Sequence, residues 1–225
     1  MLILGIDTSG KSGGVTLAEA AGADVRVMGS SPIAGGTFSA QLVPTVAALL
    51  QESHRGIRQV DCFAVVSGPG SFTGLRVGLS AVKGLAEVVE KPIVTVSLLE
   101  ALASLSPPNG RVIAALDAGR SEIFFGLYEL QPGQVALITE QLLAYDDFIL
   151  EAGKPKVAVT TSDEGVAEKL AASGVKANLV SRPDSSVIAR IGAQKFLAGC
   201  TTSVEALDAN YLRRSDAELF FKGNR

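Results

Sequence analysis

The chain has 225 residues, of which 47% are hydrophobic and 19% are charged, and its formal net charge at pH 7 is −3. This much apolar sequence can form a substantial core, which excludes a disordered chain, and the small negative charge provides no overall basic field for nucleic acid. Aromatic residues make up 5% and Trp is absent, which disfavours a broad base-stacking surface. The apolar runs are all shorter than the roughly 20 residues of a membrane-spanning helix.

The N-terminal sequence and the cysteines favour a reduced, cytoplasmic protein. The first five residues carry no basic side chain and Asp7 follows closely, so we expect no secretory signal peptide. Cys62 and Cys200 lie far apart in the sequence, and we expect two buried thiols rather than a disulfide.

The chain contains one histidine, which restricts the catalytic chemistry it can perform. His54 lies in a polar stretch that is typical of a helix end, with Gly56 as its cap. A Ser-His-Asp triad needs a histidine beside its nucleophile, and a zinc site needs more His or Cys ligands than this chain provides. We therefore expect an exposed histidine at a helix end, no metal site and no histidine-based catalysis.

In the first half of the chain, predicted strands and helices alternate. Apolar segments separated by turn residues predict an antiparallel three-strand meander, and helical periodicity follows it. A continuous apolar strand and a glycine-rich turn then lead into a long helix, as in an α/β layer. The expected strands are 2–6, 14–18, 24–28, 62–66 and 92–96, and the expected helices are 39–53, 73–89 and 98–105.

The second half repeats this pattern after a linker-like segment at 106–110. An apolar strand ending in Asp117 corresponds to the strand ending in Asp7, and two more strands follow each. The repetition predicts two related domains, 1–106 and 107–225, with a final segment that can pack back on the first domain. The expected strands are 111–116, 122–128, 134–138 and 156–159, and the expected helices are 145–152, 165–173 and 185–198, the last capped by Ser185.

The sequence Asp7-Thr8-Ser9 follows the first strand and has two interpretations. A carboxylate followed by hydroxyl groups and glycines can hold a hydrated magnesium ion and phosphate oxygens. Alternatively, Asp7 accepts hydrogen bonds within its own turn and needs no ligand, which is the commoner use of such a sequence.

A second motif, Gly68-Pro69-Gly70-Ser71-Phe72-Thr73-Gly74, precedes the long helix. Its glycines allow positive φ angles and a close approach of the backbone to a partner. Thr73 could cap the helix and leave free N–H groups at the positive end of the helix dipole, which suits an anion. Because the motif is neither a Walker A sequence nor Gly-x-Gly-x-x-Gly, it predicts an anion site or a tightly packed turn.

The helix over 73–89 carries two apolar stripes where one is enough for packing on a sheet. The second stripe therefore predicts either burial beneath another helix of the same chain or a subunit interface. The first stripe contains Leu75, Leu79, Val82, Ala86 and Val89, and the second contains Val77, Ala81, Leu85 and Val88.

Four segments along the whole chain resemble the bacterial TsaB (YeaZ) family, and the long glycine motif is the most specific of them. The matching segments are 5–9, 67–78 with the following 84–86, 117–124 and 209–213. The chain departs from the family pattern at Phe38 and Ala40, where His and Glu are usual, and at Gly119 and Ser121, where Arg and Gly are usual.

The resemblance implies an α/β fold of the actin-like ATPase (ASKHA, RNase H-like) class, with two duplicated lobes. It implies a non-catalytic subunit of the machinery that forms threonylcarbamoyladenosine in tRNA, a homodimer when alone. Its implied partners are a TsaD-like transferase, with which it forms a heterodimer, a TsaE-like ATPase, and tRNA through the complex. No membrane partner and no cofactor of its own are implied, while ATP and magnesium belong to the assembled complex. The alternative is a nucleotide-dependent kinase or ATPase, or a glycoprotease-like enzyme, of the same fold.

The resemblance and the apolar stripes together place the expected interface on the helix over 73–89, alongside the helix over 39–53. A valine at Gly74 is expected to weaken assembly and leave the protein folded. The expected interface residues are Gly70, Phe72, Thr73, Gly74, Arg76, Val77, Leu79, Ala81 and Val82. We expect no catalytic residue, and a vestigial nucleotide or metal site would lie at Asp7, Thr8, Ser9 and Asp117.

Overall fold

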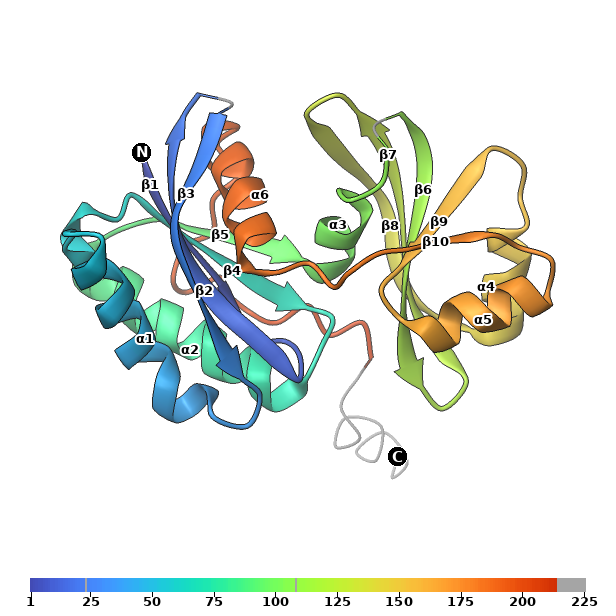
Figure 1. Cartoon of the computed structure of the whole chain (residues 1–225), viewed down its shortest axis with the longest axis horizontal. Coiled ribbons are helices and arrows are strands. Elements are labelled where there is room, and N and C mark those ends of the chain that lie inside the picture. The colour runs from blue at the N-terminus through green and yellow to red at the C-terminus, as the bar shows by residue number, and fades with distance from the viewer. Residues whose placement is uncertain (23, 108, 214–225) are drawn as a thin grey trace, which may run out of the picture. The chain divides into compact units, whose positions relative to one another are not determined.

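The structure is a computed structural model that describes every residue except 23, 108 and 214–225 (Figure 1). The last twelve residues of the expected second domain therefore lie outside the described residues. The described part alternates strands and helices and contains two five-stranded sheets. Within this part, no helix is both long and apolar enough to cross a membrane.

The first sheet joins an antiparallel meander of three strands to two parallel strands. Its order is β3-β2-β1-β4-β5, with β1 antiparallel to β2 and parallel to β4. Both β1 and β4 are buried along their whole length, as expected of central strands covered on both faces. The strands are β1 (Leu2–Asp7), β2 (Ser12–Ala21), β3 (Asp24–Ala34), β4 (Cys62–Gly68) and β5 (Ile93–Ser97).

The second sheet repeats the first, in the order β8-β7-β6-β9-β10. Each outer hairpin contains a one-residue bulge, at Met28 in β3 and at Ile138 in β8, where the register shifts. The common order and bulge confirm the predicted duplication, and the fold is the actin-like, RNase H-like α/β fold of two lobes. The strands are β6 (Gly110–Gly119), β7 (Glu122–Gln131), β8 (Gln134–Ala144), β9 (Val157–Thr161) and β10 (Ala177–Leu179).

Helices cover both faces of the first sheet, and α4 and α5 cover one face of the second (Figure 1). Leu4 and Ile6 of β1 belong to the apolar core beneath α1 and α2, while Gly5 between them meets α6 on the other face. In the second unit, α4 and α5 pack on the apolar core that contains Phe125 and Phe148. The helices are α1 (Phe38–Glu52), α2 (Phe72–Val89), α3 (Leu98–Ala103), α4 (Tyr145–Ala152), α5 (Glu164–Ala172) and α6 (Ser185–Leu197), with a 3₁₀ turn at Ile57–Gln59.

The structure divides the chain differently from the expected boundary between residues 106 and 107. The first unit contains Met1–Ala101 and Pro183–Ala209, and the second contains Leu102–Arg182 and the segment that starts at Asn210. Helix α6 belongs to the first unit because it packs on β1, β2 and β4. Glycine permits this approach, since a Cβ at Gly192 of α6 would lie 2.2 Å from the Cβ of Ala64.

Two predicted helix ends differ in detail. Helix α1 ends at Glu52, and the left-handed residue after it is His54, with φ of 52°, rather than Gly56. Asp184, and not Ser185, caps α6, because its carboxylate accepts hydrogen bonds from the N–H groups of Ser186 and Val187 at 2.9 and 3.3 Å.

The cysteine prediction holds for one of the two thiols. Cys62 is buried, and burial raises its pKa to about 12, so this thiol stays protonated and unreactive at neutral pH. Cys200 is exposed, contrary to expectation, because it lies just beyond the end of α6 on the surface of the first unit.

Candidate functional site

The two motifs singled out in the sequence meet in the first unit. The Asp7–Ser9 turn follows β1, and the glycine-rich turn follows β4. Because β1 and β4 are adjacent parallel strands, both turns leave the same edge of the sheet. The Ser71 N–H donates to the Ser9 carbonyl oxygen at 2.7 Å, and the Thr8 hydroxyl donates to the Gly74 carbonyl oxygen at 2.8 Å.

The Asp7 carboxylate is used within its own turn. Its Oδ1 atom accepts from the Ser9 N–H at 2.8 Å and from the Ser9 hydroxyl at 2.5 Å. Asp7, Thr8 and Ser9 are each 2% exposed or less. Asp7 thus makes the hydrogen bonds expected of a carboxylate that accepts within its own turn.

The glycines of the second motif make room for the first turn. A Cβ at Gly70 would lie 2.5 Å from the Ser9 carbonyl oxygen, and one at Gly74 would lie 2.0 Å from the Thr8 carbonyl oxygen. A Cβ at Gly78, one turn later, would lie 2.2 Å from the Thr8 hydroxyl. The glycines of this motif therefore pack tightly against Thr8 and Ser9.

The start of α2 differs from the sequence-based expectation. Ser71, rather than Thr73, is the N-cap, and its hydroxyl accepts from the Gly74 N–H at 3.3 Å. Phe72 begins the helix and is 38% exposed, and the Arg76 guanidinium stacks over its ring at 3.7 Å from the centroid. The exposed end of α2 thus presents a stacked aromatic and cationic pair.

The expected interface set separates into buried and accessible residues. Leu79 and Val82, at 6% and 0% exposure, belong to the core of the first unit, and Gly74 is buried against Thr8. These three residues are not accessible to a partner, because the first stripe of α2 faces the sheet. The accessible members are Gly70, Phe72, Thr73 and Arg76, which are exposed, and Val77 and Ala81, which are partly buried.

The second stripe of α2 extends this accessible surface. Val77, Ala81 and Leu85 touch the core only in part, and Val88 is 71% exposed. We call these four residues the outer stripe. The neighbouring helix α1 also carries an exposed apolar side chain, Val43, which is 51% exposed.

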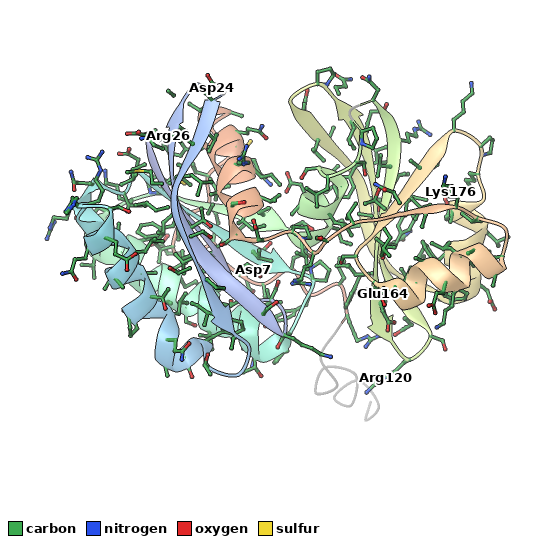
Figure 2. The ribbon with its side chains drawn as sticks, in the orientation of Figure 1. Asp7, Asp24, Arg26, Arg120, Glu164 and Lys176 are labelled. Atoms are coloured by element: carbon green, nitrogen blue, oxygen red, sulfur yellow. The ribbon has the colours of Figure 1, made fainter. Side chains whose placement is uncertain are left out.

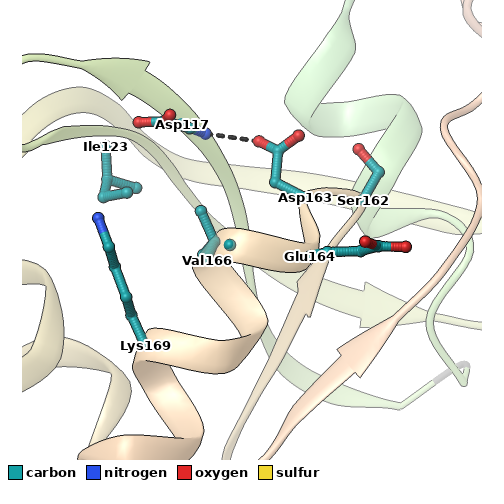
Figure 3. Close-up of a pocket in the computed structure, with 8 residues that line it drawn as sticks. Asp117, Ile123, Ser162, Asp163, Glu164, Val166 and Lys169 are labelled. Carbon is teal, nitrogen blue, oxygen red and sulfur yellow. Dashed lines mark hydrogen bonds between the residues drawn. The ribbon is translucent and has the colours of Figure 1, made fainter.

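Asp117 forms the corresponding turn in the second unit, and the two turns have different surroundings. Its Oδ1 atom accepts from the Gly119 N–H at 2.9 Å, and its own N–H donates to Asp163 at 2.6 Å (Figure 3). Asp117 is exposed, whereas Asp7 is buried at the end of β1 (Figure 2). It lines an open pocket of about 440 Å³ with Glu164 at the start of α5 and Lys169 (Figure 3).

The described residues contain no group of three or more His, Cys, Asp or Glu side chains placed to hold a metal ion. His54 is exposed at the end of α1 and is not among the residues of the two turns. In the first unit, the two hydrogen-bonded turns pack closely together and position the start of α2.

Comparison with known proteins agrees with this architecture. The family model for TsaD, described as tRNA N6-adenosine threonylcarbamoyltransferase, matches residues 32–208. The tRNA threonylcarbamoyladenosine biosynthesis protein TsaB of Bacillus subtilis is 29% identical over 232 residues, which cover 97% of this chain and 96% of that protein. TsaB of Haemophilus influenzae is 37% identical over 92 residues, covering 40% of this chain and 39% of its own length.

A solved structure gives the same result over nearly the whole chain. YeaZ from Pseudomonas aeruginosa superimposes with a TM-score of 0.75 at 27% identity, covering 93% of this chain and 100% of that one. The sequence motifs, the repeated sheet and these similarities agree with one another. The chain therefore belongs to the TsaB (YeaZ) family of tRNA threonylcarbamoyladenosine biosynthesis proteins.

Proposed function

We propose that this chain is a non-catalytic subunit of the machinery that forms N6-threonylcarbamoyladenosine in tRNA. In this proposal it supports a TsaD-like transferase by forming a heterodimer with it, and it forms a homodimer when alone. The chain acts in the cytoplasm and reaches tRNA through the complex. Near end-to-end similarity to TsaB of Bacillus subtilis supports the pathway assignment.

The observation that carries the interaction role is the accessible surface of α2. The first stripe lies in the core of the unit, whereas Val77, Ala81 and Leu85 of the outer stripe pack against that core and stay partly accessible, and Val88 is exposed, so the outer stripe leaves apolar surface for a partner. The stacked pair of Phe72 and Arg76 continues this surface at the start of the helix. Aromatic and arginine side chains are the types enriched at protein interfaces, where each partner buries about 800 Å².

The packing of the two turns supports a subunit without enzymatic activity over the kinase, ATPase or glycoprotease-like alternative. In the first unit Thr8 and Ser9 pack directly against Gly70, Gly74 and Gly78, and the Asp7 carboxylate accepts hydrogen bonds from Ser9. A turn whose carboxylate is already bonded within the turn favours a structural role over phosphate or metal binding. We therefore assign no cofactor to the chain itself, and ATP and magnesium to the assembled complex with a TsaE-like ATPase.

Reconstitution with the TsaD-like and TsaE-like proteins of the same organism tests this proposal. The modification of tRNA should fall to background when this chain is omitted, while the purified chain alone should neither hydrolyse ATP nor cleave protein. An undiminished rate without the chain would refute the partner role. ATP turnover by the isolated chain that disappears in the Asp7→Ala variant would establish the enzyme alternative instead.

A further inference from the structure

One edge of the second sheet carries a group of exposed cations. The parallel strands β6, β9 and β10 all begin at this edge. Arg111 is the second residue of β6, and Lys156 and Lys176 immediately precede β9 and β10. Lys154 lies in the same connection as Lys156, and all four residues are exposed. We call Arg111, Lys154, Lys156 and Lys176 the basic edge.

The register of the strands brings these cations close together. Arg111 pairs with Val157, the residue after Lys156, and the pairing of β10 with β9 places Lys176 beside Ala158. Adjacent strands lie about 4.8 Å apart, and residues along a strand lie about 3.3 Å apart. The Cα atoms of neighbouring cations on the three strands are therefore separated by roughly 10 Å or less.

Two members of the basic edge have no acidic partner. Among the residues that the structure describes, neither Lys156 nor Lys176 forms an ion pair, while the other two cations each pair with one carboxylate, at 3.4 and 2.5 Å. Lys156 and Lys176 each lie four residues beyond the end of a helix, α4 or α5. Stabilisation of a helix dipole is confined to the last turn, so it does not account for these two lysines.

The corresponding edge of the first sheet shows that the fold does not require unpaired cations here. Lys91, just before β5, forms an ion pair with Asp61, just before β4, at 3.6 Å. Aligning β1, β4 and β5 with β6, β9 and β10 by register matches Lys176 to Lys91 and Ala158 to Asp61. Both units thus have the cation, and the acid that neutralises it is present only in the first.

Three carboxylates of the second unit lie at the opposite edge of the sheet. Asp117, Asp163 and Glu164 line the pocket at that edge, and Glu164 begins α5 whereas Lys176 follows the other end of this helix (Figure 2). Strand β9 spans five residues, about 17 Å, which exceeds the Debye length of about 8 Å at physiological salt. The basic edge therefore keeps a local positive potential, although the net charge of the chain is −3.

We propose that the basic edge binds the phosphate backbone of tRNA, so that this chain contacts the RNA directly. The choice of RNA rests on the proposed role of the chain in tRNA modification, and the choice of phosphate rests on the charge. Lysine and arginine side chains donate to phosphate oxygens, and Lys156 and Lys176 can do so without breaking an ion pair of the protein. Such contacts position the RNA and do not read its sequence.

Binding of unmodified tRNA to the purified chain, measured by fluorescence anisotropy over a series of salt concentrations, tests the proposal. The double substitution Lys156→Glu and Lys176→Glu should weaken binding at low salt roughly tenfold or more. It should also reduce the slope of the logarithm of the binding constant against the logarithm of the salt concentration by about 1.5, because two phosphate contacts are lost. The double variant with glutamine at both positions should change binding in the same direction, and it decides the question if the glutamate variant is unfolded.

The matched control is the double substitution Lys11→Glu and Arg58→Glu at two exposed positions of the first unit, which changes the net charge by the same amount. It should bind tRNA as the unsubstituted chain does, and both double variants should still co-purify with the TsaD-like subunit. Unchanged tRNA binding without Lys156 and Lys176, or an equal loss in the control, would overturn the proposal. Loss of the TsaD-like subunit with tRNA binding retained would assign the basic edge to a protein partner and overturn it too. Failure of the proposed function is a separate result, in which tRNA modification proceeds when the whole chain is omitted.

Discussion

Replacing Gly74 with alanine is expected to destabilise the first unit by about 3 kcal/mol, although the change adds only one methyl group. A Cβ at this position would lie 2.0 Å from the Thr8 carbonyl oxygen. The backbone there cannot easily move aside, because the Thr8 hydroxyl bonds to the Gly74 carbonyl oxygen and the next residue, Ser9, bonds to the Ser71 N–H. Urea denaturation of the isolated protein should therefore show a clearly lower midpoint for Gly74→Ala.

Gly84 provides a control within the same helix. A Cβ at Gly84 would meet no atom within 4 Å, and the residue is exposed. Gly84→Ala should gain up to about 1 kcal/mol, because alanine loses less backbone entropy in a helix than glycine does. Equal midpoints for the Gly74 and Gly84 variants would show that the junction of the two turns is not as tightly packed as we infer.

The same contact corrects one expectation drawn from the sequence. A valine at Gly74 is not a selective probe of partner binding, because it must displace the backbone of Thr8 before any partner is present. The sequence shows a glycine at the start of a helix, and such a glycine can serve a turn, a ligand or a close backbone contact. Only the three-dimensional placement of Thr8 distinguishes these uses.

The order of elements and the duplication were predictable because they depend on local hydrophobic patterns. Central strands such as β1 and β4 are buried at every position and mostly apolar, and the first strand of each half has an aspartate at or near its end, before a hairpin. The prediction missed the short strand β10 and shortened β3 and β8, which continue to Ala34 and Ala144. These outer strands are partly exposed and mix polar with apolar residues, so their pattern is weak.

Long-range packing was not predictable in the same way. The apolar face of α6 shows that the helix is buried, and the structure is needed to show that it packs on the first sheet rather than the second. Likewise, both stripes of α2 have the spacing of a buried face, and the structure alone shows that the stripe with Leu79 and Val82 faces the core. A glycine such as Gly192 or Gly5 indicates that another element packs closely against the backbone, but the sequence does not show which element that is.

A glutamate in the outer stripe of α2 is expected to separate association from folding. In Ala81→Glu the added carboxylate can reach solvent, because Ala81 is only partly buried, so the fold should lose about 1 kcal/mol or less. The same charge would be trapped in any interface formed by the stripe, and binding of the TsaD-like subunit should weaken roughly tenfold or more. Light scattering of the isolated chain and co-purification with that subunit measure the two forms of association.

Val82→Glu gives the opposite result one residue further along the helix. Its side chain is 0% exposed in the core of the first unit, so an unpaired carboxylate there should cost about 4 kcal/mol and unfold the unit. Ala171→Glu, at an exposed alanine of α5, controls for the added charge and should change neither folding nor association. If Ala81→Glu is folded by circular dichroism and still associates as strongly as Ala171→Glu, the outer stripe is not the interface. A carboxylate buried in that interface would lose its hydration and weaken association.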